Sequence, residues 1–223
     1  MPEVTRIQIL DRQLASSPER YLRLETLRVR NHHADGSASR TYACDLVLAP
    51  GVDAVAVILF CREGDAVRVA VVECVRPAVS LRRELDLAVP DEREYLTVTE
   101  VVAGRFEEGD RGEEGADRRA AIEAREEAGF HVRPQDAIRL GRGLFSSPGQ
   151  TSEKVFFRAF QVEPRQRQEA AGDGSPMEEA GTLRFIELGQ AIRLCVDGEI
   201  EDPKAEVGFR RLADHLKYQA PQA

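Results

Sequence analysis

Glu123, Glu126 and Glu127 have spacings that place three acidic side chains on one stripe of a helix. At about 3.6 residues per turn, these positions project within roughly 100° of one another. Carboxylates on one stripe repel one another at neutral pH, and a bound divalent cation turns that repulsion into coordination. Hard oxygen ligands suit Mg²⁺ or Mn²⁺, which bind and polarise phosphates. The stripe therefore favours a metal site for phosphate chemistry, although a solvated acidic helix face has the same pattern.

A glycine-hinged loop, Gly104-Arg-Phe-Glu-Glu-Gly-Asp110, precedes the stripe, which lies within Ile122-Glu-Ala-Arg-Glu-Glu-Ala-Gly-Phe130. Together these segments resemble the Nudix box, which has a glycine, a spacer and then Arg-Glu-apolar-x-Glu-Glu-x-Gly-apolar. The match is good from Glu123 onward. We take Gly104 as the first glycine of the box.

Two features depart from the box. Its arginine falls on Ile122, and the spacer between Asp110 and Ile122 is four residues longer than the box allows. In the family, that arginine holds a metal-binding glutamate by a salt bridge, which isoleucine cannot do. Either Arg118, Arg119 or Arg125 substitutes from a neighbouring turn, or the enzyme is impaired.

Segments outside the box resemble the branch of Nudix hydrolases that contains the ADP-ribose, GDP-mannose and UDP-sugar pyrophosphatases. The resemblance covers about residues 40–217. Its motifs occur in the family's order, at residues 53–57, 72–78, 100–110, 147–153 and 198–204. It implies hydrolysis of a nucleoside diphosphate sugar, with ADP-ribose as the leading substrate and AMP and ribose 5-phosphate as products. The alternatives are a GDP-mannose or UDP-sugar pyrophosphatase, or a catalytically impaired protein that binds a nucleotide-sugar as a sensor.

The resemblance also assigns roles to particular residues. The metal, Mg²⁺ or alternatively Mn²⁺, is expected on Glu123, Glu126, Glu127 and the carbonyl of Ala103. Glu127 is in addition a catalytic candidate.

Substrate contacts are expected from the strand ends and loops around the box. Arg76 follows an apolar strand, and either binds a phosphate through a bidentate contact or forms a surface salt bridge. Glu100 either accepts a hydrogen bond from the substrate or forms a structural ion pair. Gly104 and Ser147, in the glycine hinge and the Ser-Pro-Gly loop, complete the set.

A separate general base is expected from a flexible segment that closes on substrate. In this branch it tends to lie in the loop after the Ser-Pro-Gly strand or in the Ser-Pro-Gly loop itself. Glu178 and Glu179 are the first choice and Glu153 is the second.

Composition narrows the class of protein. A net charge of −8 at pH 7 argues against a nucleic-acid partner held by a basic surface. The longest apolar run, residues 54–61, is far too short for a membrane span, and no secretory signal is visible. The four cysteines, Cys44, Cys61, Cys74 and Cys195, are scattered, so we expect buried free thiols and a cytoplasmic location.

The order of the predicted elements indicates an α/β (α+β) chain with a mixed β-sheet flanked by helices. The resemblance implies that this is the Nudix fold, in which helices sandwich the sheet. Residues 1–50 read as three alternating antiparallel strands, and residues 51–223 as the hydrolase domain. Because related pyrophosphatases pair through such strands, and three strands alone are marginal, a homodimer is expected. Within the main domain we expect strands at 53–60, 67–73, 97–103, 137–144, 154–162 and 183–188, a surface loop at 80–95, and helices at 116–128, 190–197 and 204–219.

Overall fold

The computed structural model describes residues 2–17, 19–172 and 182–217. The chain divides into two compact units. Unit 1 comprises Met1–Asp53 and Leu144–Lys154, and unit 2 comprises Ala54–Gly143 and Val155–Ala223.

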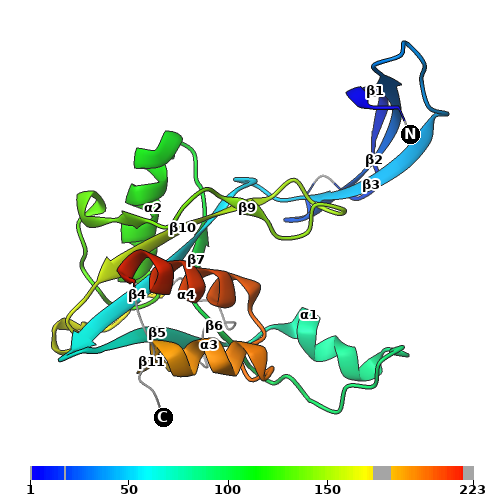
Figure 1. Cartoon of the computed structure of the whole chain (residues 1–223). Coiled ribbons are helices and arrows are strands. Elements are labelled where there is room, and N and C mark those ends of the chain that lie inside the picture. The colour runs from blue at the N-terminus through cyan, green and yellow to red at the C-terminus, as the bar shows by residue number, and fades with distance from the viewer. Residues whose placement is uncertain (1, 18, 173–181, 218–223) are drawn as a thin grey trace. The chain divides into compact units, whose positions relative to one another are not determined.

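Unit 1 is built on three antiparallel strands, coloured blue to cyan in Figure 1: β1 (Val4–Leu14), β2 (Arg23–His33) and β3 (Tyr42–Leu48). The predicted antiparallel strands are therefore confirmed. The segment 144–154, which includes β9 (Leu144–Phe145), joins β3 through a hydrogen bond of 2.8 Å from Val47 N to Gln150 O. This contact places the Ser-Pro-Gly loop in unit 1.

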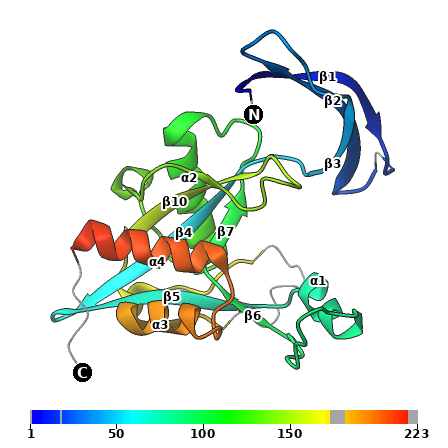
Figure 2. The same cartoon turned by 45° about the vertical axis from the view of Figure 1, so that its right-hand side comes forward.

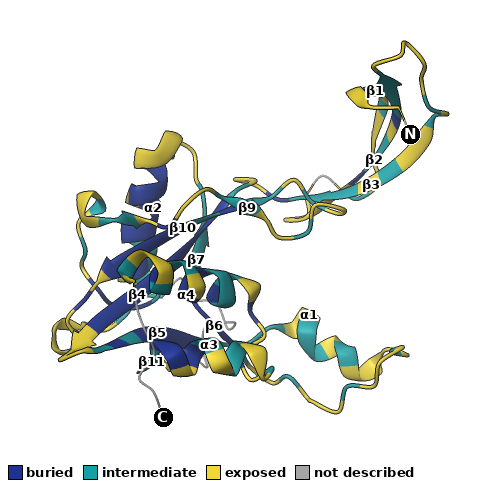
Figure 3. Ribbon diagram, in the orientation of Figure 1, coloured by how far each residue is buried: buried dark blue, intermediate teal, exposed yellow. Residues whose placement is uncertain are grey.

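Unit 1 has little core of its own, as its teal and yellow strands in Figure 3 show. Among its described hydrophobic residues, only Val29 and Ala49 are buried. Ile7 and Ile9, two apart and therefore on the same face of β1, are 62% and 58% exposed. The sheet of this unit thus presents apolar side chains that the unit itself does not cover.

Unit 2 is organised around a mixed sheet of order β11-β5-β4-β10-β8. β10 (Lys154–Gln161) runs parallel to β4 (Ala54–Glu63), whereas the other neighbours are antiparallel. The remaining strands on this path are β5 (Ala66–Cys74), β8 (Ile138–Arg139) and β11 (Arg184–Glu187). β4 occupies the centre because its apolar run, Ala54 to Cys61, is buried on both faces.

Helices cover both faces of this sheet (Figure 2). The alternation of side chains along β4 shows the two sides. Val55, Val57 and Leu59 share a core with Ala120 and Ala124 of α2 (Gly112–Glu126). The even-numbered Ile58 faces α4 (Pro203–Leu216), where a Cβ on Gly208 would meet it closer than 3.0 Å. α3 (Leu188–Val196) packs beside β11 and β5. The predicted fold class is confirmed.

Several predicted elements have other bounds. The strand expected at 97–103 is two strands, β6 (Val98–Glu100) on β5 and β7 (Val102–Arg105) on β4. Val101 lies between them, and its N–H donates to the Asp202 carboxylate (3.3 Å) instead of to a strand. α2 begins four residues before the expected start, with Glu113 and Glu114 in its first turn, where the helix dipole favours acidic residues.

The remaining differences concern short elements. The expected surface loop at 80–95 begins within a helical turn, α1 (Pro77–Ser80), followed by a 3₁₀ turn, η1 (Leu81–Glu84). The strand expected at 137–144 shortens to β8, preceded by η2 (Pro134–Asp136), and η3 (Pro164–Gln166) follows β10.

All four cysteines are free thiols, as expected, although only Cys61 is fully buried. In the described part of the chain, no helix is long and apolar enough to cross a membrane.

Candidate active site

β7 and α2 face each other at Gly104. β7 pairs with the central strand β4, with Gly104 opposite Val55 and Ala103 opposite Ala56. A Cβ on Gly104 would fall well within 3.0 Å of the Glu123 carboxylate, closer than side chains approach. Glycine at this position is therefore what allows the Glu123 carboxylate to lie against the strand.

The side chain of Glu123 is largely enclosed, at 12% exposed. Burial is the main cause that raises the pKa of its carboxyl, Arg119 opposes it, and Glu126 and Glu107 add to it, so that the pKa is about 7. When Glu123 is ionised, its surroundings thus compensate its negative charge only in part.

Glu127 approaches the same strand one residue earlier. It is the C-cap of α2, and its Oε2 accepts a hydrogen bond of 3.2 Å from Ala103 N–H. Glu123 and Glu127 therefore meet the consecutive residues Gly104 and Ala103. Glu126 is more exposed, at 40%, and forms an ion pair of 2.7 Å with Arg125.

This arrangement bears on the expected metal. Within the described ranges, no three Asp, Glu, His or Cys side chains are gathered closely enough to form a metal site as they stand. The donors themselves are carboxylate oxygens, which suit Mg²⁺. Glu123 and Glu127 both lie against β7, where position 104 has no room for a side chain. In donor type and convergence, these residues fit a divalent metal.

Arg119 makes the arginine contact to Glu123 that Ile122 cannot make. Its side chain is only 7% exposed, and it donates to Asp110 (2.8 Å) and Glu107 (3.0 Å). Its Nη1 lies 3.7 Å from Glu123 Oε1, one turn further along α2. Arg119 is four residues before Glu123, and side chains four residues apart lie on the same face of a helix. Of the three arginines considered from sequence, Arg119 is the one that contacts Glu123.

Arg76 and Glu100 form an ion pair, with Arg76 Nε donating to Glu100 Oε1 at 2.6 Å. Lys204 Nζ lies 3.3 Å from the other oxygen of Glu100 and 2.8 Å from Asp202. Although burial alone would raise it, the pKa of Glu100 is lowered by Arg76 and Lys204. Of the two roles expected for Glu100, the ion pair is the one that its contacts match. The side chain of Arg76 is 38% exposed.

The other predicted site residues lie in unit 1 or outside the described residues. Ser147 and Glu153 lie in unit 1, where Ser147 O accepts from Gln150 N–H (3.0 Å) and Glu153 accepts from Ser146 Oγ (3.2 Å). Glu178 and Glu179 lie outside the described residues. The roles of these four residues remain predictions.

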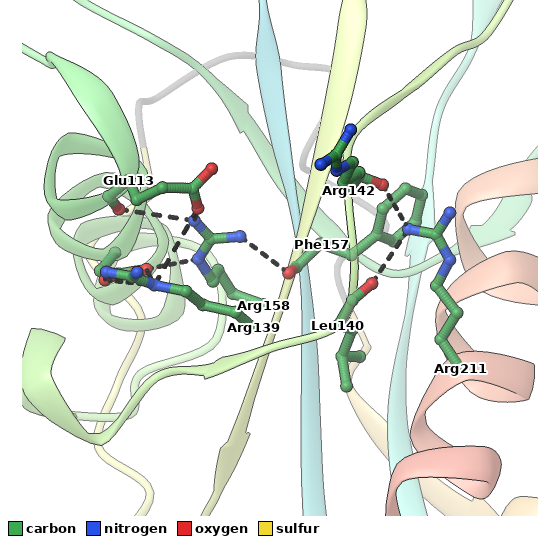
Figure 4. Close-up of polar contacts among 8 residues, drawn as sticks. Glu113, Arg139, Leu140, Arg142, Phe157, Arg158 and Arg211 are labelled. Atoms are coloured by element: carbon green, nitrogen blue, oxygen red, sulfur yellow. Dashed lines mark hydrogen bonds and ion pairs between the residues drawn. The ribbon is translucent and has the colours of Figure 1, made fainter.

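Sequence reasoning missed a polar network around a buried arginine, which joins α2 to β8 and β10 (Figure 4). Arg158 of β10 is completely buried, and it bonds to Asp117 and Glu113 of α2 and to Phe157 O (3.0 Å). Arg139 of β8 also binds Asp117, at 2.6 Å. The available signal was an arginine inside the apolar run Val155 to Phe160, where an unpaired charge would be costly.

A further arginine, on α4 at the other face of the sheet, contacts β10 and the segment after β8. Arg211 of α4 donates to Leu140 O (3.0 Å) and Arg142 O (2.7 Å), and its guanidinium lies over the Phe157 ring (Figure 4). The segment after β8 is thereby fixed to α4.

Comparison with known proteins rests on structure. No family model matches the sequence, and no curated protein matches it. The crystal structure of an ADP compounds hydrolase superposes with a TM-score of 0.67 at 16% identity, covering 99% of each chain.

Two looser likenesses add nothing further to the fold assignment. A C. elegans Ap4A hydrolase has a TM-score of 0.45 at 12% identity, covering 74% of this chain and 98% of that one. The Nudix domain of Shewanella oneidensis NrtR, complexed with ADP ribose, has a TM-score of 0.43 at 11% identity, covering 74% and 88%. On the full-length likeness and the sheet and helices described above, the chain has the fold of the ADP compounds hydrolase.

Proposed function

We propose that this protein is a Mg²⁺-dependent hydrolase of the diphosphate bond in nucleoside diphosphate sugars, with ADP-ribose as the leading substrate. The products are AMP and ribose 5-phosphate. The observation that carries the proposal is the convergence of Glu123 and Glu127 on Gly104 and Ala103, in a chain with the fold of the ADP compounds hydrolase.

Glu123, Glu126, Glu127 and the Ala103 carbonyl would hold the metal. When bound, it would neutralise the two negative charges of the diphosphate, which otherwise repel an attacking water. Arg119 keeps the Glu123 carboxylate oriented, so the loss of the box arginine at Ile122 is compensated within the same helix. This compensation favours a working enzyme over an impaired binding protein.

Arg76 would contact a substrate phosphate with guanidinium donors that Glu100 does not use. Glu100 holds the Arg76 side chain in place through its ion pair. The proton of the attacking water would pass to a carboxylate, with Glu178 and Glu179 as first candidates and Glu153 as the second.

Unit 1 supports a second part of the proposal, a homodimer formed through the β1–β3 sheet. The exposed Ile7 and Ile9 are apolar surface that association of two copies would remove from water. A partner chain of the same sequence is the proposed occupant.

The test is a panel of nucleotide-sugars incubated with the purified protein and Mg²⁺, with products identified by mass. Release of AMP and ribose 5-phosphate from ADP-ribose is the expected result. Faster cleavage of GDP-mannose or UDP-sugars would move the assignment within the same reaction class. Binding of a nucleotide-sugar without any cleavage would replace the enzyme with a sensor-like protein.

A further inference from the structure

The last turn of α2 carries two of the three glutamates, Glu126 and Glu127, at the point where a helix is least constrained. The final carbonyl groups of a helix have no partner inside the helix, and terminal turns fray unless other groups bind them. A carboxylate in such a turn keeps a fixed direction only if those carbonyls are held.

In this chain a distant segment holds them. Residues 164–172 return to the end of α2, where Gly172 N–H donates to Glu126 O (3.0 Å) and Gln168 N–H donates to Gly129 O (2.9 Å). Between them, Arg167 Nε donates to Ala128 O at 3.0 Å. The carbonyl oxygens of Glu126, Ala128 and Gly129, at and just after the end of α2, thus all accept hydrogen bonds from one segment about forty residues further along the chain.

Gly129 is the residue that permits this approach. Its φ of +74° ends the helix in the left-handed conformation, and its N–H bonds back to Arg125 O (3.0 Å). A Cβ at this position would collide with Gln168 O. The glycine is therefore required both by the backbone conformation and by the proximity of the returning segment.

We propose that Arg167 is a positioning residue, which fixes the last turn of α2 and through it the directions of Glu126 and Glu127. Arg167 supplies the side-chain donor among these three hydrogen bonds, whereas Gln168 and Gly172 donate through backbone N–H groups, which only proline would remove directly. A guanidinium at a helix C-terminus also interacts favourably with the helix dipole. This inference rests on the proposed metal-dependent function of the glutamates.

Arg167 lends itself to a clean experiment because it is largely exposed, so its truncation removes little buried surface. The variants are Arg167→Ala and Arg167→Lys. The matched control is Arg165→Ala, an exposed arginine two residues earlier that makes no described hydrogen bond to α2. Three quantities are measured: Mn²⁺ binding without substrate by electron paramagnetic resonance, the Mg²⁺ concentration for half-maximal hydrolysis, and hydrogen exchange of the Glu127, Gly129 and Phe130 amides.

Arg167→Ala is expected to weaken Mn²⁺ binding and raise the Mg²⁺ requirement by about tenfold, the scale seen when a group supporting a metal ligand is lost. The three amides should exchange faster, while the melting temperature falls by no more than about 4 °C. Arg167→Lys should recover part of the loss because an ammonium can donate to the same carbonyl. Arg165→Ala should match the wild type.

Equal metal binding and exchange in Arg167→Ala and Arg165→Ala would overturn the positioning role while leaving the hydrolase proposal intact. A melting-temperature loss with unchanged Mn²⁺ binding would also overturn it, since it would reveal a structural role only. A wild-type protein that neither binds Mn²⁺ nor hydrolyses any substrate of the panel would instead remove the proposed function, and the role of Arg167 with it.

Discussion

Arg119 Nη1 lies 3.7 Å from Glu123 Oε1, and the same guanidinium donates to Asp110 in the loop before α2. One side chain therefore connects the loop, the helix and the glutamate that rests against Gly104. Arg119 lies four residues before Glu123, so a residue one turn earlier on α2 makes the contact to Glu123 that Ile122 cannot make.

Replacement of Arg119 should accordingly impair catalysis more than any change at Ile122. Arg119→Ala is expected to lower kcat/KM by about 10²-fold, the scale of a misplacement of about 1 Å. Ile122→Arg should change it by less than about tenfold. The exposed Arg118→Ala is the matched control, and Arg125→Ala, whose partner is Glu126, should be milder than Arg119→Ala. A large gain from Ile122→Arg alone would show that Arg119 does not compensate.

Glu127→Gln should remove a metal-bearing charge while keeping the shape of the side chain. We expect kcat for ADP-ribose to fall by at least about 10²-fold, as when one major catalytic group is lost. Glu206→Gln, in an exposed ion pair with Arg210 on α4, should leave kcat unchanged. Full activity of the Glu127 variant, or of the wild type in excess chelator, would refute the metal mechanism.

Arg76→Lys keeps the positive charge and removes the planar fork. If Arg76 binds a phosphate of the substrate, KM should rise about tenfold with a smaller change in kcat, because binding in the ground state is mainly affected. Arg82→Lys is the control, since Arg82 is likewise paired with a carboxylate, that of Asp91. Identical steady-state constants for both variants would reduce Arg76 to a structural partner of Glu100.

The homodimer proposal predicts a mass by light scattering of about twice 24.8 kDa. Ile9→Glu places a charge on the exposed apolar face of β1 and should shift the protein toward the monomer, since burial of an unpaired charge is unfavourable. Leu81→Glu, an equally exposed apolar position in unit 2, is the control. A wild-type monomer that is active at nanomolar concentration contradicts this arrangement.

Asp117 should make stability depend on acid pH. Burial favours a higher pKa for its carboxyl, but hydrogen bonds from Arg139 and Arg158 outweigh burial and lower it from 3.8. Because the folded pKa lies below the unfolded one, the stabilisation is present above about pH 4 and is lost as the pH falls through the folded pKa.

Asp117→Asn should therefore reduce the unfolding free energy by about 3 kcal/mol at pH 7, as expected when a buried pair is broken. The difference from wild type should shrink at pH 3, as measured by urea unfolding. Asp136→Asn, which disrupts the exposed pair with Arg133, should cost less than about 1 kcal/mol at either pH. A difference for Asp117→Asn that is constant across pH would contradict the assignment.

Local pattern alone predicted much of this molecule. Alternation with period two identified the three strands of unit 1, and continuous apolar runs identified β4 and β5. The segment that carries Glu123, Glu126 and Glu127 was predicted as a helix at 116–128, and α2 spans Gly112–Glu126. These features depend on neighbours a few residues away, which is why they are readable from the chain.

Contacts between distant residues required the tertiary structure. Three arginines near Ile122 were equivalent in sequence, and only the packing of α2 against β7 and the preceding loop selects Arg119. Arg158 resembled an interruption of an apolar strand until its pairing with Asp117, 41 residues earlier, became visible. The break at Val101 and the return of Arg167 to Ala128 likewise depend on groups far away in the chain. Side-chain periodicity determines which face a residue occupies, whereas the partner that it meets there is decided by how the elements pack.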